Sequence, residues 1–227
     1  MKTKRVLKRK RSIRDYFVSS KRQKNKSSRY LLTKVISGGQ TGADRAALEA
    51  ALEAGIATGG WAPPGFVTSR GTDLVLRDRF HLVELLPKGG RFRSSVAAGY
   101  VQRSKANVDA ADGTLAFRLH ASMGTDKTIA YAQSGHWTTR NCGTTRTTTT
   151  LSLLPDDPYR PCLVVTSLAE KDLASNIETI CQFILTHHIT ILNVCGHREA
   201  PPDCPNFSET IQGLLTKCFS ALCTELQ

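Results

Sequence analysis

The sequence predicts an α/β fold in which helices cover both faces of a mostly parallel sheet. Short apolar runs alternate with longer helix-like stretches along most of the chain, and this alternation is typical of parallel sheets because each parallel connection needs a crossover. The apolar runs are KVIS (34–37), HLVEL (81–85), TLAF (114–117), CLVVT (162–166) and ITILNVC (189–195). The helix-like stretches are 42–54, 94–108, 125–134, 172–187 and 208–226. We therefore expect a Rossmann-like, three-layer domain.

The last of these stretches shows the clearest helical periodicity. One apolar stripe at helical spacing is formed by Ile211, Leu214, Leu215, Cys218, Phe219, Leu222 and Leu226. This pattern predicts a helix whose apolar side packs on the sheet.

Composition divides the chain into a tail, a domain and an insertion. Residues 1–31 are too charged and too poor in aliphatic side chains to fold alone, so we expect a disordered basic tail. We expect residues 32–227 to form the Rossmann-like domain. Within it, the threonine-rich stretch that starts TTRNCGTTRTTTT predicts an insertion at about 138–160.

The positive charge belongs to the tail. The chain carries a formal charge of +12, and residues 1–30 hold 13 Lys and Arg but one acid, Asp15. The remaining residues hold 18 basic (31 − 13) and 18 acidic (19 − 1) side chains. A balanced body argues against a basic nucleic-acid-binding domain.

Cysteine usage and hydropathy indicate the cellular compartment. The seven cysteines are odd in number and scattered, which favours reduced thiols. No run approaches the roughly 18 apolar residues of a membrane helix, so we expect no membrane contact. We predict a cytoplasmic or nuclear location and leave an organellar presequence as the alternative.

The loop after residues 34–37 is the strongest candidate for a binding site. It reads SGGQTGADR (37–45), with three glycines that let backbone N–H groups approach a ligand. Thr41 followed by Asp44 resembles a capping box, with Thr41 as N-cap. Donors at a helix N-terminus suit an anion such as phosphate. The alternative is a tight strand-to-helix turn, which accounts for one glycine more readily than for three.

Two further loops follow predicted strands. After 114–117 comes ASMGTDKT (121–128), in which Thr125 is a candidate N-cap and Gly124 opens the backbone. After 189–195 comes GHRE (196–199), in which Arg198 offers a fork for phosphate or a carboxylate. The carboxyl ends of parallel strands share one edge of the sheet, so we expect the three loops to converge.

Other candidates are weaker. The segment GGWAPPG (59–65) offers Trp61 as a flat wall of the site or as a core residue, with equal weight. The six histidines show no metal-ligand spacing, and G-x-S-x-G and H-E-x-x-H motifs are absent from the sequence. We therefore predict no metal ligands and no catalytic residues.

Several of these motifs, in the same order, resemble a known family. ISGGQTGADRAALEAALEAGI, GGWAPPG, ADGTLAF, GTDKT, RPCLVV and LNVCGHRE are similar to the putative molybdenum carrier family, the molybdenum cofactor carrier proteins. That family is a circularly permuted, YpsA-like branch of the SLOG superfamily. The resemblance covers about residues 34–224 apart from the insertion, and its first motif is the most specific.

The resemblance implies a homo-oligomeric carrier that stores, protects or transfers molybdenum cofactor, with a molybdoenzyme as acceptor. The phosphate of this molybdopterin would lie on the 38–42 loop, with Gly124 and Thr125 opposite and Gly196 and Arg198 at the rim. The full set of candidate ligand-binding residues is Ser37, Gly38, Gly39, Gln40, Thr41, Gly42, Asp44, Arg45, Trp61, Gly124, Thr125, Lys127, Gly196 and Arg198.

Two alternatives stay open. Related SLOG proteins include phosphoribohydrolases, but Thr128 stands where those enzymes carry a glutamate. An enzyme acting on a nucleotide derivative would therefore need Asp44 or Asp126 instead.

The tail segment KRSIRDYF (10–17) resembles a sliding-clamp-binding box, with Ile13, Tyr16 and Phe17 as its hydrophobic plug and Lys10 in place of the usual Gln. Its basic clusters also resemble a bipartite nuclear signal.

Overall fold

The structure of the chain is a computed structural model, and it describes residues 32–86, 96–137, 160–198, 200–202 and 204–224. The predicted basic tail, with its clamp-like segment, and all of the threonine-rich insertion except residue 160 lie outside these residues.

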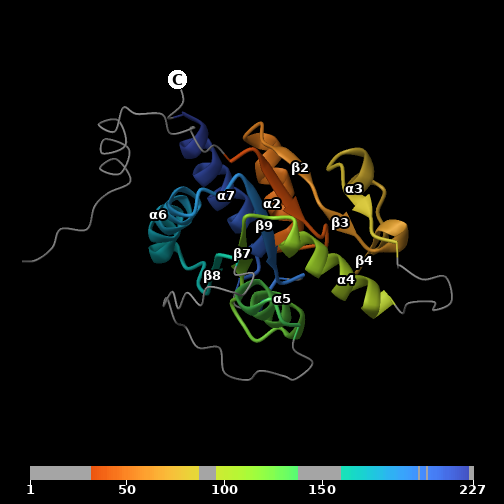
Figure 1. Cartoon of the computed structure of the whole chain (residues 1–227). Coiled ribbons are helices and arrows are strands. Elements are labelled where there is room, and N and C mark those ends of the chain that lie inside the picture. The colour runs from red at the N-terminus through yellow and green to blue at the C-terminus, as the bar shows by residue number, and fades with distance from the viewer. Residues whose placement is uncertain (1–31, 87–95, 138–159, 199, 203, 225–227) are drawn as a thin grey trace, which may run out of the picture.

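A five-stranded parallel sheet forms the centre of the domain (Figure 1). Its strands are β1 (Lys34–Ser37), β2 (Ala57–Gly59), β7 (Gly113–Phe117), β8 (Cys162–Val165) and β9 (Ile191–Gly196). They lie in the order β2-β1-β9-β7-β8, and all four pairings are parallel. The predicted α/β, Rossmann-like fold is therefore confirmed.

Helices cover both faces of this sheet. On one face α7 lies between α2 and α6, which both pack against it, and on the other face α4 packs beside α5 (Figure 1). The bounds are α2 (Ala43–Glu53), α4 (Val96–Asp109), α5 (Met123–Ser134), α6 (Glu170–Thr186) and α7 (Phe207–Thr224). Among the described helices, none is long and apolar enough to cross a membrane.

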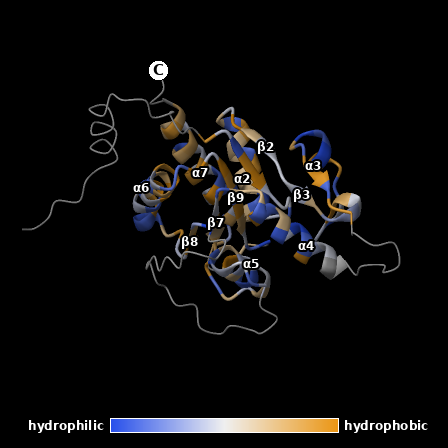
Figure 2. Cartoon of the chain, in the orientation of Figure 1, coloured by the Kyte–Doolittle hydropathy of each residue, from blue (hydrophilic) through white to orange (hydrophobic). Residues whose placement is uncertain are grey.

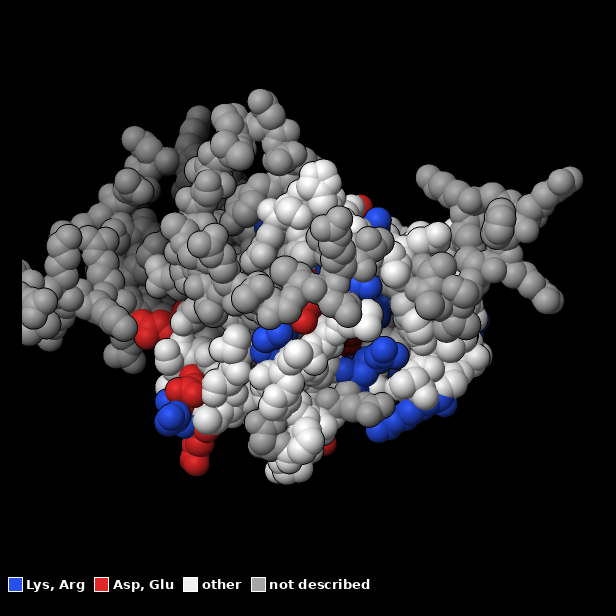
Figure 3. All heavy atoms as spheres, turned by 90° about the horizontal axis from the view of Figure 1, so that it is seen from below, with Lys and Arg blue, Asp and Glu red and all other residues white. Residues whose placement is uncertain are grey.

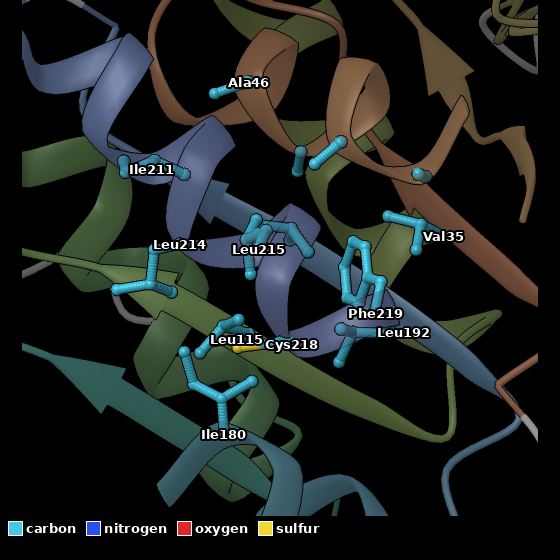
Figure 4. Close-up of a cluster of buried hydrophobic side chains, with 14 of the residues drawn as sticks. Val35, Ala46, Leu115, Ile180, Leu192, Ile211, Leu214, Leu215, Cys218 and Phe219 are labelled. Atoms are coloured by element: carbon cyan, nitrogen blue, oxygen red, sulfur yellow. The ribbon is translucent and has the colours of Figure 1, made fainter. Parts of the chain in front are cut away.

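The main hydrophobic core lies under α2, α6 and α7. The apolar stripe predicted on the last helix is buried from Ile211 to Leu222, and Leu226 lies outside the described residues. Side chains of the stripe meet Val35, Leu115 and Leu192 from three strands (Figure 4). Hydrophobic residues are accordingly frequent in the central strands and in α7 (Figure 2). Each large apolar side chain buried here contributes about 1.5–3 kcal/mol. This face stabilises the fold.

The opposite face of the sheet is more polar. Strand pairing aligns Ile36, Asn193, Thr114 and Cys162 in one row across the sheet, on the face covered by α4 and α5. Asn193 Nδ2 donates to Thr114 Oγ1 over 3.2 Å, so this buried pair satisfies part of its hydrogen-bonding capacity internally. A polar cavity can therefore form here without disturbing the main core.

The expected strand at 81–85 is shorter and lies outside the main sheet. Only Val83–Glu84 (β6) pair, in parallel, with Trp61–Ala62 (β3), while β2 occupies the sheet edge. The small elements around them are η1 (Pro64–Phe66), β4 (Val67–Thr68), β5 (Gly71–Thr72) and α3 (Val75–Asp78). They enclose a second core of Leu48, Ala62, Phe66, Leu76, Phe80 and Leu82. The apolar run at 81–85 thus includes a residue of this second core, Leu82.

Candidate functional site

Three loops meet at the carboxyl edge of the sheet, as the sequence predicts. They follow β1, β9 and β7, which are neighbours in the sheet. The amide of Ala43, at the start of α2, donates to the His197 carbonyl over 3.1 Å, and Thr41 Oγ1 donates to the Arg198 carbonyl over 2.6 Å. The β1–α2 turn and the β9–α7 loop are therefore bonded to each other.

His197 connects the third loop. The backbone amides of Leu119 and His120, which follow β7, donate to His197 Nε2 over 3.0 and 3.1 Å. An Nε2 atom that accepts these bonds carries no proton. The imidazole also meets the Phe207 ring edge-on, with ring centroids 5.8 Å apart. One side chain thus links the loop after β7 to the loop after β9 and to the start of α7.

A cavity of about 360 Å³ opens where these loops meet α4 and α5. Ligands of open α/β sheets bind in such a crevice beyond the carboxyl ends of the strands. The lining residues are Gln40, Asp44, Tyr100, Val101, Arg103, Ser104, Ser122, Met123, Gly124, Thr125, Lys127, Thr128, Trp137, Cys195, Gly196 and Arg198.

The start of α5 faces this cavity. The N-cap is Ser122 and the helix begins at Met123, so the predicted N-cap Thr125 is wrong and lies within the first turn. The hydroxyls of Ser122 and Thr125 are 3.1 Å apart. A Cβ atom on Gly124 would meet nothing within 4 Å. The first-turn amides of a helix have no partner within the helix, so α5 offers backbone donors to the cavity.

The start of α2 is capped differently from the prediction. Its N-cap is Gly42, without a side-chain cap, so the predicted role of Thr41 as N-cap is wrong. Asp44 does reach back, but it accepts from the Gln40 amide over 3.2 Å. The helix terminus is closed by backbone, because a Cβ atom on Gly42 would lie 2.3 Å from the His197 carbonyl oxygen. The helix N-terminus that opens into the cavity is that of α5.

The other two glycines of the loop make room for protein side chains. A Cβ atom on Gly39 would lie 2.5 Å from a methyl of Leu76 and 2.8 Å from a methyl of Leu82. A Cβ atom on Gly38 would overlap the Arg103 guanidinium. The close approach that the glycines suggest is real, and what approaches is the protein's own second core and its own arginine.

Asp44 and Arg103 form a buried ion pair at the floor of the cavity. Arg103 Nη1 donates to Asp44 Oδ2 over 3.3 Å, and the side chains are 11% and 5% exposed. Burial raises the pKa of Asp44, and the charges of Arg103 and Arg198 and the Gln40 amide offset this only in part. The carboxyl is therefore easier to protonate than an ordinary aspartate.

Positive charge predominates in the cavity lining. The basic side chains are Arg103, Lys127 and Arg198, and the acid among the lining residues is Asp44. The guanidinium carbons of Arg198 and Arg103 lie 5.5 and 6.0 Å from the centre of the Tyr100 ring, as cation–π contacts. Viewed from below, Lys and Arg side chains lie near the middle of the molecule (Figure 3). Such a lining favours an anion.

Two polar atoms of the lining residues lack partners within the described part of the chain. Gln40 is 1% exposed; its Nε2 donates to the Val67 carbonyl over 3.1 Å, while its buried Oε1 has no hydrogen bond. The buried Nε of Arg103 likewise has none. An unpaired buried polar group costs about 1–3 kcal/mol. A ligand with an N–H donor at Gln40 would satisfy its Oε1, whereas the Nε of Arg103 lies against Gly38, which is outside the cavity lining.

Half of the predicted binding residues line this cavity: Gln40, Asp44, Gly124, Thr125, Lys127, Gly196 and Arg198. Thr41, Gly42 and Arg45 lie at an adjacent cleft next to Ser208 and Glu209 at the start of α7, and Arg45 pairs there with Asp73. The other four do not reach the cavity lining: Ser37, Gly38, Gly39 and Trp61.

The contribution of α4 to the cavity is not evident from the sequence. Tyr100, Val101, Arg103 and Ser104 line the cavity from this helix, and Trp137 follows α5. No motif marks these residues, because an arginine on an amphipathic helix is most often solvated. The one available signal was Gly38, whose missing side chain leaves the space that Arg103 fills. Among the described residues, no group of three or more His, Cys, Asp or Glu side chains is placed to hold a metal ion.

The fold and the cavity define a Rossmann-like protein with a cation-rich crevice at the carboxyl edge of its sheet. The chain belongs to the circularly permuted YpsA SLOG family, whose model matches residues 35–219. Its structure is similar to the crystal structure of a protein named putative molybdenum carrier protein from Syntrophus aciditrophicus SB. The identity is 27%, the match covers 83% of this chain and 95% of that one, and the TM-score is 0.59. The search of curated proteins found no match to this chain.

Proposed function

We propose that this protein binds a phosphorylated heteroaromatic cofactor in the cavity between α4 and α5, and that the cofactor is molybdenum cofactor. The protein would store, protect or transfer it without turnover. The observation that carries the proposal is the pairing of two features in one cavity. The first feature is a set of backbone donors and basic side chains that suits an anion. The second is the buried Gln40 Oε1, which has no hydrogen-bond donor.

The chemistry of molybdenum cofactor fits these residues. Its phosphate would take the first-turn amides of α5 together with Lys127 and Arg198, and its pterin N–H groups would satisfy Gln40 Oε1. When bound, this group supplies a dithiolene-held molybdenum to an acceptor enzyme. The similar protein from Syntrophus is named putative molybdenum carrier protein, and this name supports a ligand that contains molybdenum. The residues of this chain would hold the cofactor and shield it from water.

The test is retention of the cofactor during purification. We would purify the protein anaerobically from a host that makes molybdenum cofactor, oxidise the released ligand to its fluorescent pterin and count molybdenum per chain. We expect pterin and metal near one per chain. Protein without pterin, purified from a host whose molybdoenzymes are active, would contradict the proposal.

A matched pair of variants locates the site. Gly124→Asp places a carboxylate in the first turn of α5, where open space lets the fold accept it and the helix dipole favours it. The carboxylate would repel the phosphate, so we expect the bound pterin to be lost. Gly213→Asp makes the same change in α7, also in open space and away from the cavity, and should retain the pterin.

A second candidate function is hydrolysis of a nucleotide derivative. It is favoured by the buried carboxyl of Asp44, whose raised pKa suits a general acid in a cavity of this size. Turnover of a nucleoside monophosphate, lost in Asp44→Asn, would support it. Stoichiometric retention of pterin without turnover favours the carrier.

The predicted partners are part of the proposal. The family resemblance supports a homo-oligomer and a molybdoenzyme as acceptor, and light scattering of the purified protein tests the first. A peptide of residues 8–26 tests the sliding clamp: binding lost when Ile13 and Phe17 are both changed to Ala would support it. Binding that depends on salt but not on these residues would indicate electrostatic attraction alone.

A further inference from the structure

The charge balance of the cavity depends on one carboxylate. Asp44 is 3% exposed and lines the cavity together with Arg103, Lys127 and Arg198. The guanidinium of its partner Arg103 fills the space beside Gly38 and makes a cation–π contact with the Tyr100 ring. While Asp44 is ionised it cancels the charge of Arg103, so Lys127 and Arg198 leave a net charge of +2 for the ligand.

An anion that enters this cavity approaches a buried negative charge. Repulsion between like charges favours the protonated form of a carboxyl group. The same repulsion, by reciprocity, makes the anion bind more tightly once the carboxyl is protonated. Both effects are strong here, because a buried carboxylate is poorly screened by solvent.

We propose that Asp44 is a specificity-determining residue that couples anion binding in this cavity to the uptake of a proton. A dianion enters as Asp44 takes a proton from solvent, and the charge of Arg103, which Asp44 then no longer cancels, attracts the anion. Ionisation of Asp44 in turn weakens the hold on the anion. This inference rests on the proposed function, since it concerns the same cavity.

The groups around Asp44 favour this coupling. Arg103 of α4, Arg198 after β9 and Lys127 of α5 are cations, and Cys195 of β9 is kept as a neutral thiol because burial raises its pKa. The neighbouring Arg45 of α2 pairs instead with Asp73. Because burial already raises the pKa of Asp44 itself, a smaller further displacement by the bound anion is enough to protonate the carboxyl.

The sign of the expected pH dependence follows from two effects on Asp44: burial and the bound anion both favour its protonated form. The pKa of Asp44 is raised in the free protein and would be higher still in the complex. Anion affinity should be highest at low pH, where Asp44 is protonated in both states. It should fall as pH rises through the pKa of the free protein and level off above that of the complex.

Sulfate is the probe, because it stays a dianion throughout the neutral and mildly acidic range. We would titrate it into the full chain by calorimetry in two buffers of different ionisation enthalpy, which reports protons taken up on binding. We expect proton uptake by the wild type, and a sulfate affinity that falls on the order of tenfold as pH rises through the pKa values of Asp44 in the free protein and in the complex. That change corresponds to one unit of pKa displacement. Gly124→Asp should abolish the binding, which places the sulfate in this cavity.

Asp44→Asn removes the titrating group and keeps an acceptor for the Gln40 amide. We expect this variant to bind sulfate without proton uptake, with an affinity independent of pH and no lower than that of the acidic wild type. The control is Asp126→Asn, which removes a carboxylate paired with Arg118 outside the cavity lining and should keep the wild-type pH slope. If Asp44→Asn does not fold, the double variant Asp44→Asn with Arg103→Gln removes both charges, and its proton uptake should also vanish.

Sulfate binding by the wild type without proton exchange would overturn this inference and leave the proposed function standing. Weaker binding by Asp44→Asn at every pH, or an unchanged pH slope, would overturn it as well. If the wild type binds no sulfate, the inference fails, and pterin retention then decides the proposed function separately.

Discussion

Arg103 occupies the space that a side chain on Gly38 would need. A Cβ atom on Gly38 would lie 1.2 Å from Arg103 Nη1 and 2.0 Å from its guanidinium carbon. The guanidinium is held there by Asp44, which is itself buried. The glycine, the arginine and the aspartate come from the loop after β1, from α4 and from α2, so one small packing relationship joins three elements at the cavity floor.

Gly38→Ala should therefore displace Arg103. We expect the free energy of unfolding to fall by about 2 kcal/mol, because the Asp44 carboxylate loses a charged partner while the arginine can still swing toward the cavity. Urea unfolding measures this. Gly213→Ala is the control: its Cβ would meet nothing, and a helical Gly→Ala change should add up to about 1 kcal/mol. Equal stability of Gly38→Ala and wild type would contradict the prediction.

Gly39→Ala separates packing from ligand binding in the same loop. Gly39 has a φ of 70°, and its Cβ would press on Leu76 and Leu82, so we expect a loss of about 1–3 kcal/mol in unfolding free energy. The protein that remains folded should bind sulfate as the wild type does, because Gly39 does not line the cavity. Lost affinity with unchanged stability would restore the sequence-based interpretation of this glycine.

Much of the fold could be predicted because it rests on long periodic segments. The apolar runs at β1, β7, β8 and β9 and the stripe of α7 each indicate burial on their own. Strand β2 could not be predicted in this way. Its three residues, Ala57–Gly59, include no large apolar side chain, and it forms because it pairs with β1. Tertiary pairing outweighed local propensity at that edge.

The candidate site, like the fold, could be predicted only in part. The order of strands and loops in the sequence alone predicts that three loops share one sheet edge. In the structure Gln40, Gly124 and Arg198 from these loops do line one cavity. The sequence could not indicate which helix terminus stays open, because that depends on His197, whose carbonyl closes α2. The role of Arg103 was equally hidden, since it depends on how α4 crosses the loop after β1.

Asp112 should make the stability depend on pH in the acidic range. One of its oxygens, Oδ2, accepts from the Thr190 amide, the Thr190 hydroxyl and the Ile191 amide over 2.9, 2.6 and 2.8 Å. Burial alone would raise the pKa of this carboxyl, but these hydrogen bonds outweigh it, so the pKa is lowered. The stabilisation should be present above the unfolded-state pKa of about 3.9 and be lost as pH falls through the folded-state value.

Asp112→Asn tests this dependence. The neutral amide accepts more weakly than a carboxylate, so we expect the variant to be less stable at neutral pH by roughly 1 kcal/mol, after allowance for solvent screening. The difference from wild type in urea unfolding should shrink as pH falls below the unfolded-state pKa. A difference that stays constant with pH would argue against an ionised Asp112.

His197 should be required as an acceptor rather than as a space-filling ring. Its Nε2 accepts hydrogen bonds from two backbone amides of the loop after β7. A substitution that leaves these amides unpaired would lower the free energy of unfolding by about 1–3 kcal/mol. His197→Gln supplies an amide oxygen in a similar position and should recover at least half of the stability lost in His197→Leu, which keeps comparable bulk against Phe207. Sulfate affinity should follow the same order, because this loop leads into the first turn of α5. His136→Leu, at an exposed site beyond α5, controls for loss of a histidine. If His197→Leu and His197→Gln unfold at the same urea concentration, the His197 ring acts through packing and not as an acceptor for the loop after β7.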